Sequence, residues 1–247
     1  QNSEIEGIDI MLAIDVSTSM LAEDLKPNRL EAAKDVAAEF INGRPNDNIG
    51  ITLFAGETFT QCPLTVDHAV LLDMIHNIKC GLITDGTAVG MGIANAVTRL
   101  KDSKAKSKVI ILLTDGTNNK GDISPMTAAE IAKSFGIRVY TIGVGTNGMA
   151  PYPYPVGNTV QYVSMPVEID EKTLTEIAGT TDGNYFRATS NSKLKEVYEE
   201  IDKLEKTKLN VKEYSKRDEE YHWFALAAFL CVLLEVLLRN SVLKKIP

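Results

Sequence analysis

The chain has 247 residues, 44% of them apolar and 24% charged, which fits one large globular domain with a further segment attached. The formal net charge is -7 and the lysines are scattered, so the chain lacks the basic stripe that nucleic-acid binding requires. Three cysteines are too few for a disulfide scaffold, and no pair of them has the spacing of a zinc site.

Apolar runs rich in Val, Ile and Leu predict buried β-strands as far as residue 144. These runs lack the alternation of apolar and polar residues that marks a strand with one wet face. Helical patterns separate them, which implies right-handed crossovers and an α/β fold with a doubly wound, mostly parallel sheet flanked by helices. The predicted strands are 8–14, 49–54, 109–113 and 137–144, and the predicted helices are 29–41, 68–78, 89–100 and 128–135.

Residues 145–163 are dense in Gly and Pro and predict a loop or a small hairpin. A surface for a protein partner and a hairpin that packs its own tyrosine rings, from Tyr152 to Tyr162, are both open interpretations of this segment. The α/β rhythm then resumes and completes a domain over residues 1–205. Its last predicted elements are a helix at 170–178, a turn at 181–183, a strand at 184–187 and an amphipathic helix from 192 to about 205.

A charged linker is expected over residues 206–221, and an apolar segment follows it. Residues 223–238 carry one charge, Glu235, but these 16 residues fall short of the roughly 20 that a bilayer span needs. A helix over 222–243, in which Arg239 snorkels, reaches that length. We favour a transmembrane helix over a buried core helix, because an apolar segment after a charged linker has no evident core to enter.

The tail after this helix, residues 244–247, is short and basic. Arg239, Lys244 and Lys245 face no acidic residue at this end of the segment. By the positive-inside rule the tail lies in the cytoplasm, which places the globular domain on the outer side of the membrane.

Oxygen-bearing side chains follow the predicted strands at one edge of the sheet. Asp15, Ser17 and Ser19 come after the first strand, Thr87 precedes a helix, and Asp115 ends a later strand. Each motif alone also fits ordinary turn and helix-cap chemistry. Together they place hard oxygen donors where doubly wound sheets bind ligands, which predicts a site for a small hard cation such as Mg²⁺.

The same residues resemble a known motif. Asp15-Val16-Ser17-Thr18-Ser19, with Thr87 and Asp115, is similar to the metal-ion-dependent adhesion site of von Willebrand factor A (VWA) domains, and the resemblance covers residues 7–205. Residues 54–65, 85–100 and 244–247 further resemble BatA-type membrane proteins of the Bacteroides aerotolerance family.

The resemblance implies a role for each site residue. Ser17 and Ser19 would ligate the metal directly, and Thr87 would do so in one of two domain states. Asp15 and Asp115 would act mostly through waters. One position would stay open for an Asp or Glu of a protein partner. The implied ion is Mg²⁺, with Mn²⁺ or Ca²⁺ as alternatives, and the implied activity is protein binding rather than catalysis.

The resemblance also implies a cellular context. It is that of a bacterial inner-membrane protein with its VWA domain in the periplasm and further membrane helices upstream of Gln1. The implied partners are other Bat proteins and a cytoplasmic MoxR-type ATPase.

Two enzymatic interpretations compete with this one. Residues 143–148 spell the dinucleotide-binding fingerprint, but Pro151, Pro153 and Pro155 forbid the helix that would bind the pyrophosphate. A Mg²⁺-dependent hydrolase or phosphoryl-transfer enzyme built on Asp15 is the more serious alternative. Such enzymes typically carry a second carboxylate two residues after the nucleophile, where this chain has Ser17.

Cysteines and histidines add little to the functional prediction. Cys62 and Cys80 either form a disulfide in an oxidising compartment or remain separate thiols, and the sequence leaves both open. His68 and His76 lie two turns apart in one helical pattern, which favours surface or half-buried positions over a catalytic pair.

Overall fold

The computed structural model describes residues 7–157 and 159–215, together with the helical positions Leu226, Ala228, Val232 and Glu235. The chain divides after Glu205 into two compact units, and the first of them contains the sheet and the helices packed on it. Apart from those four positions, the predicted transmembrane helix at 222–243 and the tail at 244–247 lie outside the described residues. Within the described part of the chain, no helix is long and apolar enough to cross a membrane.

A six-stranded sheet forms the centre of the domain, in the order β3-β2-β1-β4-β5-β8. All neighbouring pairs are parallel except β2 and β3, which confirms the predicted mostly parallel α/β sheet. The strands are β1 (Asp9–Asp15), β2 (Asn48–Phe54), β3 (Thr58–Thr65), β4 (Lys108–Thr114), β5 (Ile137–Val144) and β8 (Tyr185–Ala188).

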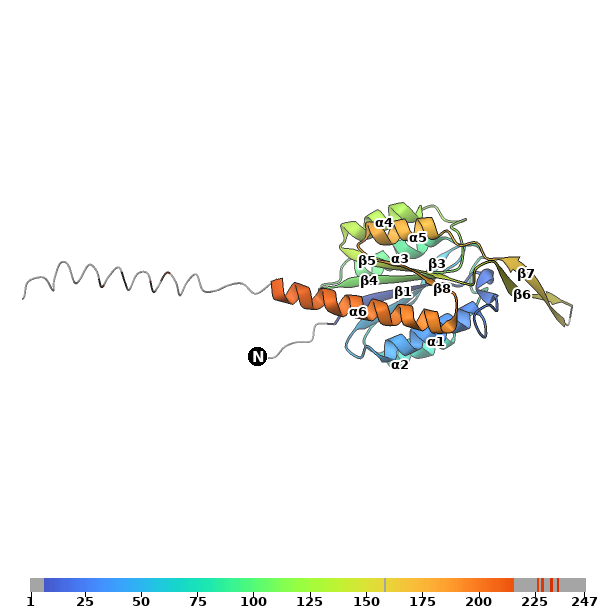
Figure 1. The fold of residues 1–247 in the computed structure, drawn as a ribbon, viewed down its shortest axis with the longest axis horizontal. Helices are drawn as coiled ribbons and strands as arrows, with labels where there is room; N and C mark the ends of the chain where they lie inside the picture. Colours follow the sequence, from blue (N-terminus) through green and yellow to red (C-terminus); the bar gives the residue numbers. More distant parts are fainter. Residues whose placement is uncertain are drawn as a thin grey trace, which may run out of the picture. The chain divides into compact units, whose positions relative to one another are not determined.

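Helices cover both faces of this sheet (Figure 1). Helices α3, α4 and α5 pack on one face, where Ile93, Ala132 and Ile177 share a core with Met11 and Leu112 of the sheet. Helices α1, α2 and α6 lie on the other face (Figure 1). The bounds are η1 (Thr18–Leu21, a 3-10 turn), α1 (Arg29–Asn42), α2 (His68–His76), α3 (Val89–Leu100), α4 (Pro125–Ser134), α5 (Glu171–Thr180) and α6 (Asn191–Ser215).

Strand β3 and helix α6 both differ from the sequence prediction. Strand β3 was not predicted, because the Thr58–Thr65 run is half-buried, mixes polar with apolar residues and contains Pro63, as edge strands do. Helix α6 continues past its predicted end near residue 205 to Ser215, and half of residues 206–215 are Lys, Leu or Glu, which are good helix formers. Glu205 holds α6 on the sheet, where its carboxylate accepts hydrogen bonds from Tyr140 (2.6 Å) and Ser107 (2.9 Å).

The Gly- and Pro-rich segment forms a separate two-stranded antiparallel sheet, β6 (Met149–Val156) and β7 (Thr159–Pro166). The sequence predicted either a loop or a small hairpin here, and the structure shows the hairpin. Gly157 stands at its turn with φ +59°, a left-handed conformation that suits glycine. The hairpin projects from the domain beyond the end of β5 (Figure 1).

The topology brings the predicted site together. Strand β1 pairs in parallel register with both β2 and β4, so the chain order reverses between β1 and β4. The carboxyl ends of these two central strands therefore lie side by side, with Asp15 at the end of β1 and Asp115 directly after β4. Such a switch point is where doubly wound sheets bind ligands.

Candidate metal centre

Asp15 is fully buried at the end of β1, and both of its carboxylate oxygens are hydrogen-bonded. Oδ1 accepts from the Ser17 backbone N–H at 2.9 Å, and Oδ2 accepts from the Thr114 hydroxyl at 2.6 Å. The first bond closes a local turn between the end of β1 and the start of η1, where the two serines lie.

Three further predicted residues form one hydrogen-bonded chain. The hydroxyls of Ser17 and Ser19 lie 2.9 Å apart, and the Ser19 hydroxyl donates to Asp115 Oδ1 at 2.7 Å. Ser17 and Asp115 are each 3% exposed, so both side chains are largely shielded from bulk water. Four of the five predicted ligands thus share one compact cluster.

Thr87 joins the cluster from a separate loop, just before α3. Its backbone N–H donates to Asn119 Oδ1 and its carbonyl accepts from the Asn119 N–H, both at 2.9 Å. A Cβ on Gly116, the residue after Asp115, would lie 3.3 Å from the Thr87 hydroxyl. The structure therefore brings Thr87 beside the Asp115 loop, but through backbone contacts and not through a hydrogen bond to the other four side chains.

Arg29 is a site residue that the sequence prediction missed. Its guanidinium, 4% exposed, donates to Asp115 Oδ2 at 2.7 Å and binds both oxygens of Asp24, at 2.8 and 2.7 Å. Asp24 in turn accepts from the Thr146 N–H at 2.7 Å. One signal could have found Arg29, because it stands in the buried stripe of α1 with Ala33 and Phe40, where a charge demands a partner.

The two buried carboxylates carry more negative charge than their surroundings balance. Burial raises the pKa of Asp15 to about 7, and repulsion from Asp115 adds to the effect. Burial also raises the pKa of Asp115, although Arg29 opposes that shift. A cation at this position would relieve both effects, so the residues present fit a divalent metal ion.

The chemistry of the donors favours a hard ion. Within the described residues, no group of three or more His, Cys, Asp and Glu side chains could hold a metal, so any ion here depends on hydroxyl oxygens as well as carboxylates. Cys80 lies nearby, where its thiol donates to the Ser17 carbonyl at 3.3 Å. Burial and the surrounding carboxylates raise the Cys80 pKa to about 12, which keeps this thiol protonated and unsuited to binding a metal. Cys62 and Cys80 are both free thiols in the structure.

The loops around the cluster are fixed by other side chains. Asp85 accepts from the Thr18 N–H at 3.0 Å and from the Thr18 hydroxyl at 2.7 Å, which ties the Thr87 loop to the serine loop. The dinucleotide fingerprint at 143–148 leads directly into β6 and not into a helix, so it lacks the helix N-terminus that would bind a pyrophosphate.

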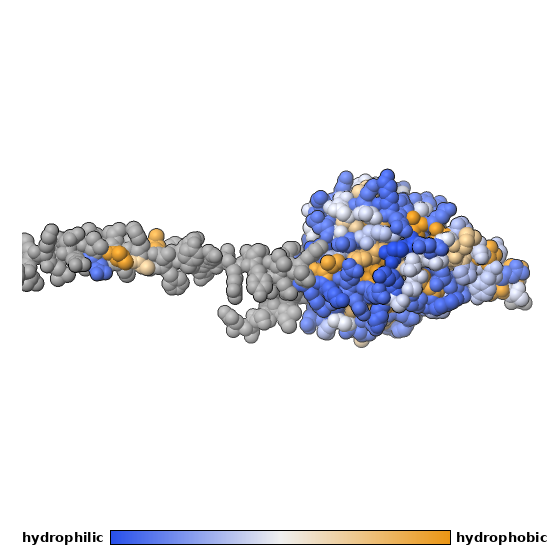
Figure 2. Space-filling model, in the orientation of Figure 1, coloured by the Kyte–Doolittle hydropathy of each residue, from blue (hydrophilic) through white to orange (hydrophobic). Residues whose placement is uncertain are grey.

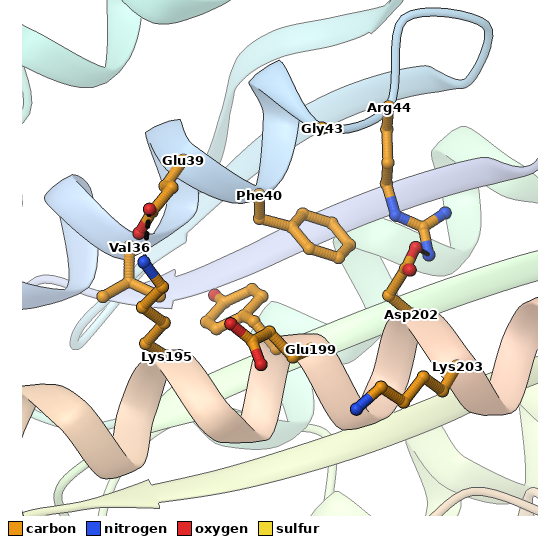
Figure 3. Close-up of a pocket in the computed structure, with 10 residues that line it drawn as sticks. Val36, Glu39, Phe40, Gly43, Arg44, Lys195, Glu199, Asp202 and Lys203 are labelled. Atoms are coloured by element: carbon orange, nitrogen blue, oxygen red, sulfur yellow. Dashed lines mark hydrogen bonds and ion pairs between the residues drawn. The ribbon is translucent and has the colours of Figure 1, made fainter.

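A pocket of about 360 Å³ lies away from this edge, between α1 and α6. Figure 3 shows Lys195 reaching Glu39, and Arg44 reaching Asp202, across its mouth. The Arg44 guanidinium also lies 4.6 Å above the Phe40 ring. The charged side chains that line this pocket are therefore engaged mainly with one another.

The mostly parallel α/β sheet flanked by helices is that of a known class of domain. Residues 9–200 match the von Willebrand factor type A domain, and this chain belongs to that family. A mussel byssus protein, proximal thread matrix protein 1, shares the fold with 25% identity and a TM-score of 0.63 over 80% of this chain and 45% of its own. Its solved structure has a zinc-occupied metal-ion-dependent adhesion site.

Two Bacteroides proteins are similar to this chain along almost their whole solved length. One is an aerotolerance-related membrane protein from Bacteroides fragilis, solved with multiple mutations to serine, which is 32% identical with a TM-score of 0.70 over 80% of this chain and 98% of that one. The other is BatB from Bacteroides thetaiotaomicron, 34% identical with a TM-score of 0.71 over 81% of this chain and all of that one. The predicted resemblance to VWA proteins of the aerotolerance family is confirmed.

Two further relatives are longer than the region that matches this chain. An uncharacterised protein from Borreliella burgdorferi is 28% identical over 97% of this chain and 71% of its own length. A UPF0353 protein from Mycolicibacterium paratuberculosis is 32% identical over 76% of this chain, and the match spans 58% of that relative.

Proposed function

We propose that this chain is a protein-binding module whose VWA domain captures a partner through a divalent metal ion. The observation that carries the proposal is the hydrogen-bonded cluster of Asp15, Ser17, Ser19 and Asp115 at the carboxyl edge of the sheet. Ser17 and Ser19 would hold the ion through their hydroxyls, with Thr87 able to join them. Asp15 and Asp115 would hold its water molecules and supply negative charge.

This donor set explains why a partner would bind. Two serine hydroxyls are neutral ligands, and each carboxylate already accepts hydrogen bonds from the protein. An ion bound mainly by neutral oxygens keeps much of its positive charge and gains from one more anionic ligand. An Asp or Glu of a partner is that ligand. We take Mg²⁺ as the ion, with Mn²⁺ or Ca²⁺ as substitutes, because every donor is a hard oxygen.

The relatives support a cellular setting for the proposal. The Bacteroides fragilis relative is a membrane protein related to aerotolerance, and the BatB relative shares the same domain. We propose that this chain belongs to a comparable bacterial system, with residues 222–243 as a membrane anchor and the domain on the periplasmic side. Other Bat proteins and a MoxR-type ATPase are its proposed associates.

A metal-dependent hydrolase is the alternative. The groups that touch the two carboxylates are serine and threonine hydroxyls, a backbone N–H and Arg29, whose guanidinium does not deprotonate in proteins. The described histidines, His68 and His76, lie on α2, where the His68 ring contacts the Asp47 carbonyl. These surroundings favour binding over general acid–base chemistry.

Affinity capture from detergent-solubilised membranes tests the proposal, with the full chain as bait. Three samples are compared: Mg²⁺, chelator, and the Ser17→Ala variant in Mg²⁺. We expect proteins that only the unmodified, metal-loaded bait retains. Ser134→Ala is the matched control, since it removes a hydroxyl that bonds only to its own helix. Equal retention in all samples, or Mg²⁺-dependent turnover of a phosphate ester, would contradict the proposal.

A further inference from the structure

The hairpin is unlike the rest of the surface, because residues 145–166 contain no Asp, Glu, Lys or Arg in a chain that is 24% charged. All eight residues of β7 are exposed, including Val160 (59%), Tyr162 (60%) and Met165 (47%). Figure 2 shows orange, apolar residues among paler and blue ones on this projection. Uncharged, apolar side chains that stand free of the domain are typical of a binding surface.

The outer edge of β6 is closed to further strand pairing. Pro151, Pro153 and Pro155 occupy alternate positions, opposite Ser164, Tyr162 and Val160. Because proline has no N–H, these three residues cannot donate a hydrogen bond to β7. The residues between them make the hydrogen bonds of the ladder, and the backbone carbonyls of the prolines point away from β7. The Pro151 carbonyl indeed points outward, where it accepts the Glu23 N–H at 2.8 Å. Along these residues the β6 edge offers acceptors without donors.

The outer edge of β7 is open. By the same alternation, the N–H and C=O groups of Val160, Tyr162 and Ser164 point away from β6. The hairpin is a two-stranded sheet, and among the described residues no backbone hydrogen bond reaches these three positions. Proteins usually protect such an edge with charges or proline. Here β6 is protected in that way and β7 is not.

The hairpin is continuous with the metal edge. Besides the Pro151 contact, the Tyr162 hydroxyl donates to Glu23 Oε1 at 3.0 Å. Glu23 lies four residues after Ser19. At the base of the hairpin, the Thr146 N–H binds Asp24, which binds Arg29 and through it Asp115. A partner seated on the metal therefore lies beside the hairpin.

We propose that the β7 edge takes an extended, uncharged segment of the same partner as a third strand. This inference rests on the proposed function for the partner's identity. A partner that brings a carboxylate to the metal must approach a chain of net charge -7, and the uncharged hairpin offers it contact without repulsion. Backbone hydrogen bonds to the edge would give affinity, and Tyr162 and Val160 would give side-chain selectivity.

A second copy of this chain fits the edge less well. It would bring a second chain of net charge -7 close to the first. Pairing of two eight-residue strands alone also buries less than the roughly 1,200–2,000 Å² of a stable complex. A partner that contacts both the metal edge and the hairpin meets a larger continuous surface.

The probe is the capped neutral peptide acetyl-Thr-Val-Thr-Tyr-Thr-Val-Thr-amide, titrated into the isotopically labelled full chain. We expect chemical-shift changes and slowed hydrogen exchange at the amides of Val160, Tyr162 and Ser164. A peptide with alternate N-methylated amides should bind at least tenfold more weakly, because it cannot pair along the edge. Absence of changes at these amides, or equal binding of the two peptides, would overturn the inference.

Variants of the chain give a second comparison. Val160→Pro and Ser164→Pro remove outward N–H groups, as the prolines of β6 do, and should weaken peptide binding at least tenfold. Val160→Thr and Ser164→Ala keep those groups and should bind normally. Binding should persist in chelator and in Ser17→Ala, so failure of the metal proposal and failure of this one are distinguishable. Concentration-dependent dimers without peptide would assign the edge to a second copy and overturn the choice of partner.

Discussion

The metal edge and the α1–α6 pocket both gather charged side chains, but they balance them differently. In the pocket, Glu39 faces Lys195 and Asp202 faces Arg44, so acids and bases are matched. At the edge, Asp15 and Asp115 lie buried among hydroxyls, and Arg29 contacts only one of them. The pocket between α1 and α6 is therefore not the best candidate site here, because its charged side chains are already paired. The better candidate is the place where oxygen donors converge with unbalanced charge.

The largest expected effect is on metal affinity at the edge. Ser17→Ala removes a proposed direct ligand, and we expect at least a 100-fold loss of Mg²⁺ or Mn²⁺ affinity by calorimetric titration. The folded domain should lose only about 1 kcal/mol, the usual value of one hydrogen bond. Affinity within twofold of the unmodified chain would remove Ser17 from the site, and Ser134→Ala controls for loss of a hydroxyl elsewhere.

The next effect concerns the positive charge of Arg29, which contacts Asp115 and Asp24. Arg29→Met leaves Asp24 and Asp115 buried without their cation, so we expect a loss of about 3–5 kcal/mol in the free energy of unfolding. Chemical denaturation measures it. Added Mg²⁺ should restore part of the loss, because it neutralises Asp115. A stability unchanged within about 1 kcal/mol would show that the Arg29 bridges do not support the fold.

The corresponding change in the pocket should separate stability from function. Arg44→Met breaks the contacts of a 3% exposed guanidinium with Asp47 and Asp202, and we expect a loss of about 2–4 kcal/mol in the free energy of unfolding. Metal affinity should stay within twofold of the unmodified chain. A tenfold change in metal affinity would show that the pocket and the metal edge are coupled.

The smallest effect is a pH dependence at Asp24. Burial opposes ionisation of this carboxyl, but hydrogen bonds from Arg29 and the Thr146 N–H lower its pKa below the usual value. A carboxyl with a lowered folded-state pKa stabilises the fold above its unfolded pKa, near 3.9, and loses that contribution as the pH falls through the folded value. The stability difference between the unmodified chain and Asp24→Asn, about 1–3 kcal/mol, should therefore be full at pH 7 and shrink below about pH 4.

Stability measured across pH 3 to pH 7 gives that difference directly. Asp35→Asn, at an exposed position of α1, is the matched control. A difference that does not change with pH would contradict the role assigned to the Asp24 carboxylate.

Much of this organisation could be predicted from the sequence. Buried parallel strands appear as unbroken apolar runs, which is why β1, β2, β4 and β5 were predicted within two residues of their observed ends. The cluster was predicted because Asp15 and Asp115 follow strands that must end at one edge. The roles of the five residues as metal ligands remain a proposal.

The features that were missed depend on tertiary contacts. Strand β3 is recognisable only by its pairing with β2, since its own sequence has no clear period. In the sequence, Arg29 is only the first residue of a predicted helix. It belongs to the site because its guanidinium donates to Asp115, 86 residues away. The open edge of β7 follows from its register against the prolines of β6, which the sequence alone leaves undefined.

Mn²⁺ electron paramagnetic resonance on the full chain shows directly whether this edge binds a metal ion. We expect one bound Mn²⁺ per chain, coordinated by oxygen and exchangeable water, displaced by Mg²⁺, and lost in the Ser17→Ala, Ser19→Ala double variant. We also expect a soluble carboxylate, such as acetate, to replace one water ligand. A chain that binds no Mn²⁺, or whose Mn²⁺ signal survives the double variant unchanged, would contradict the proposed metal site.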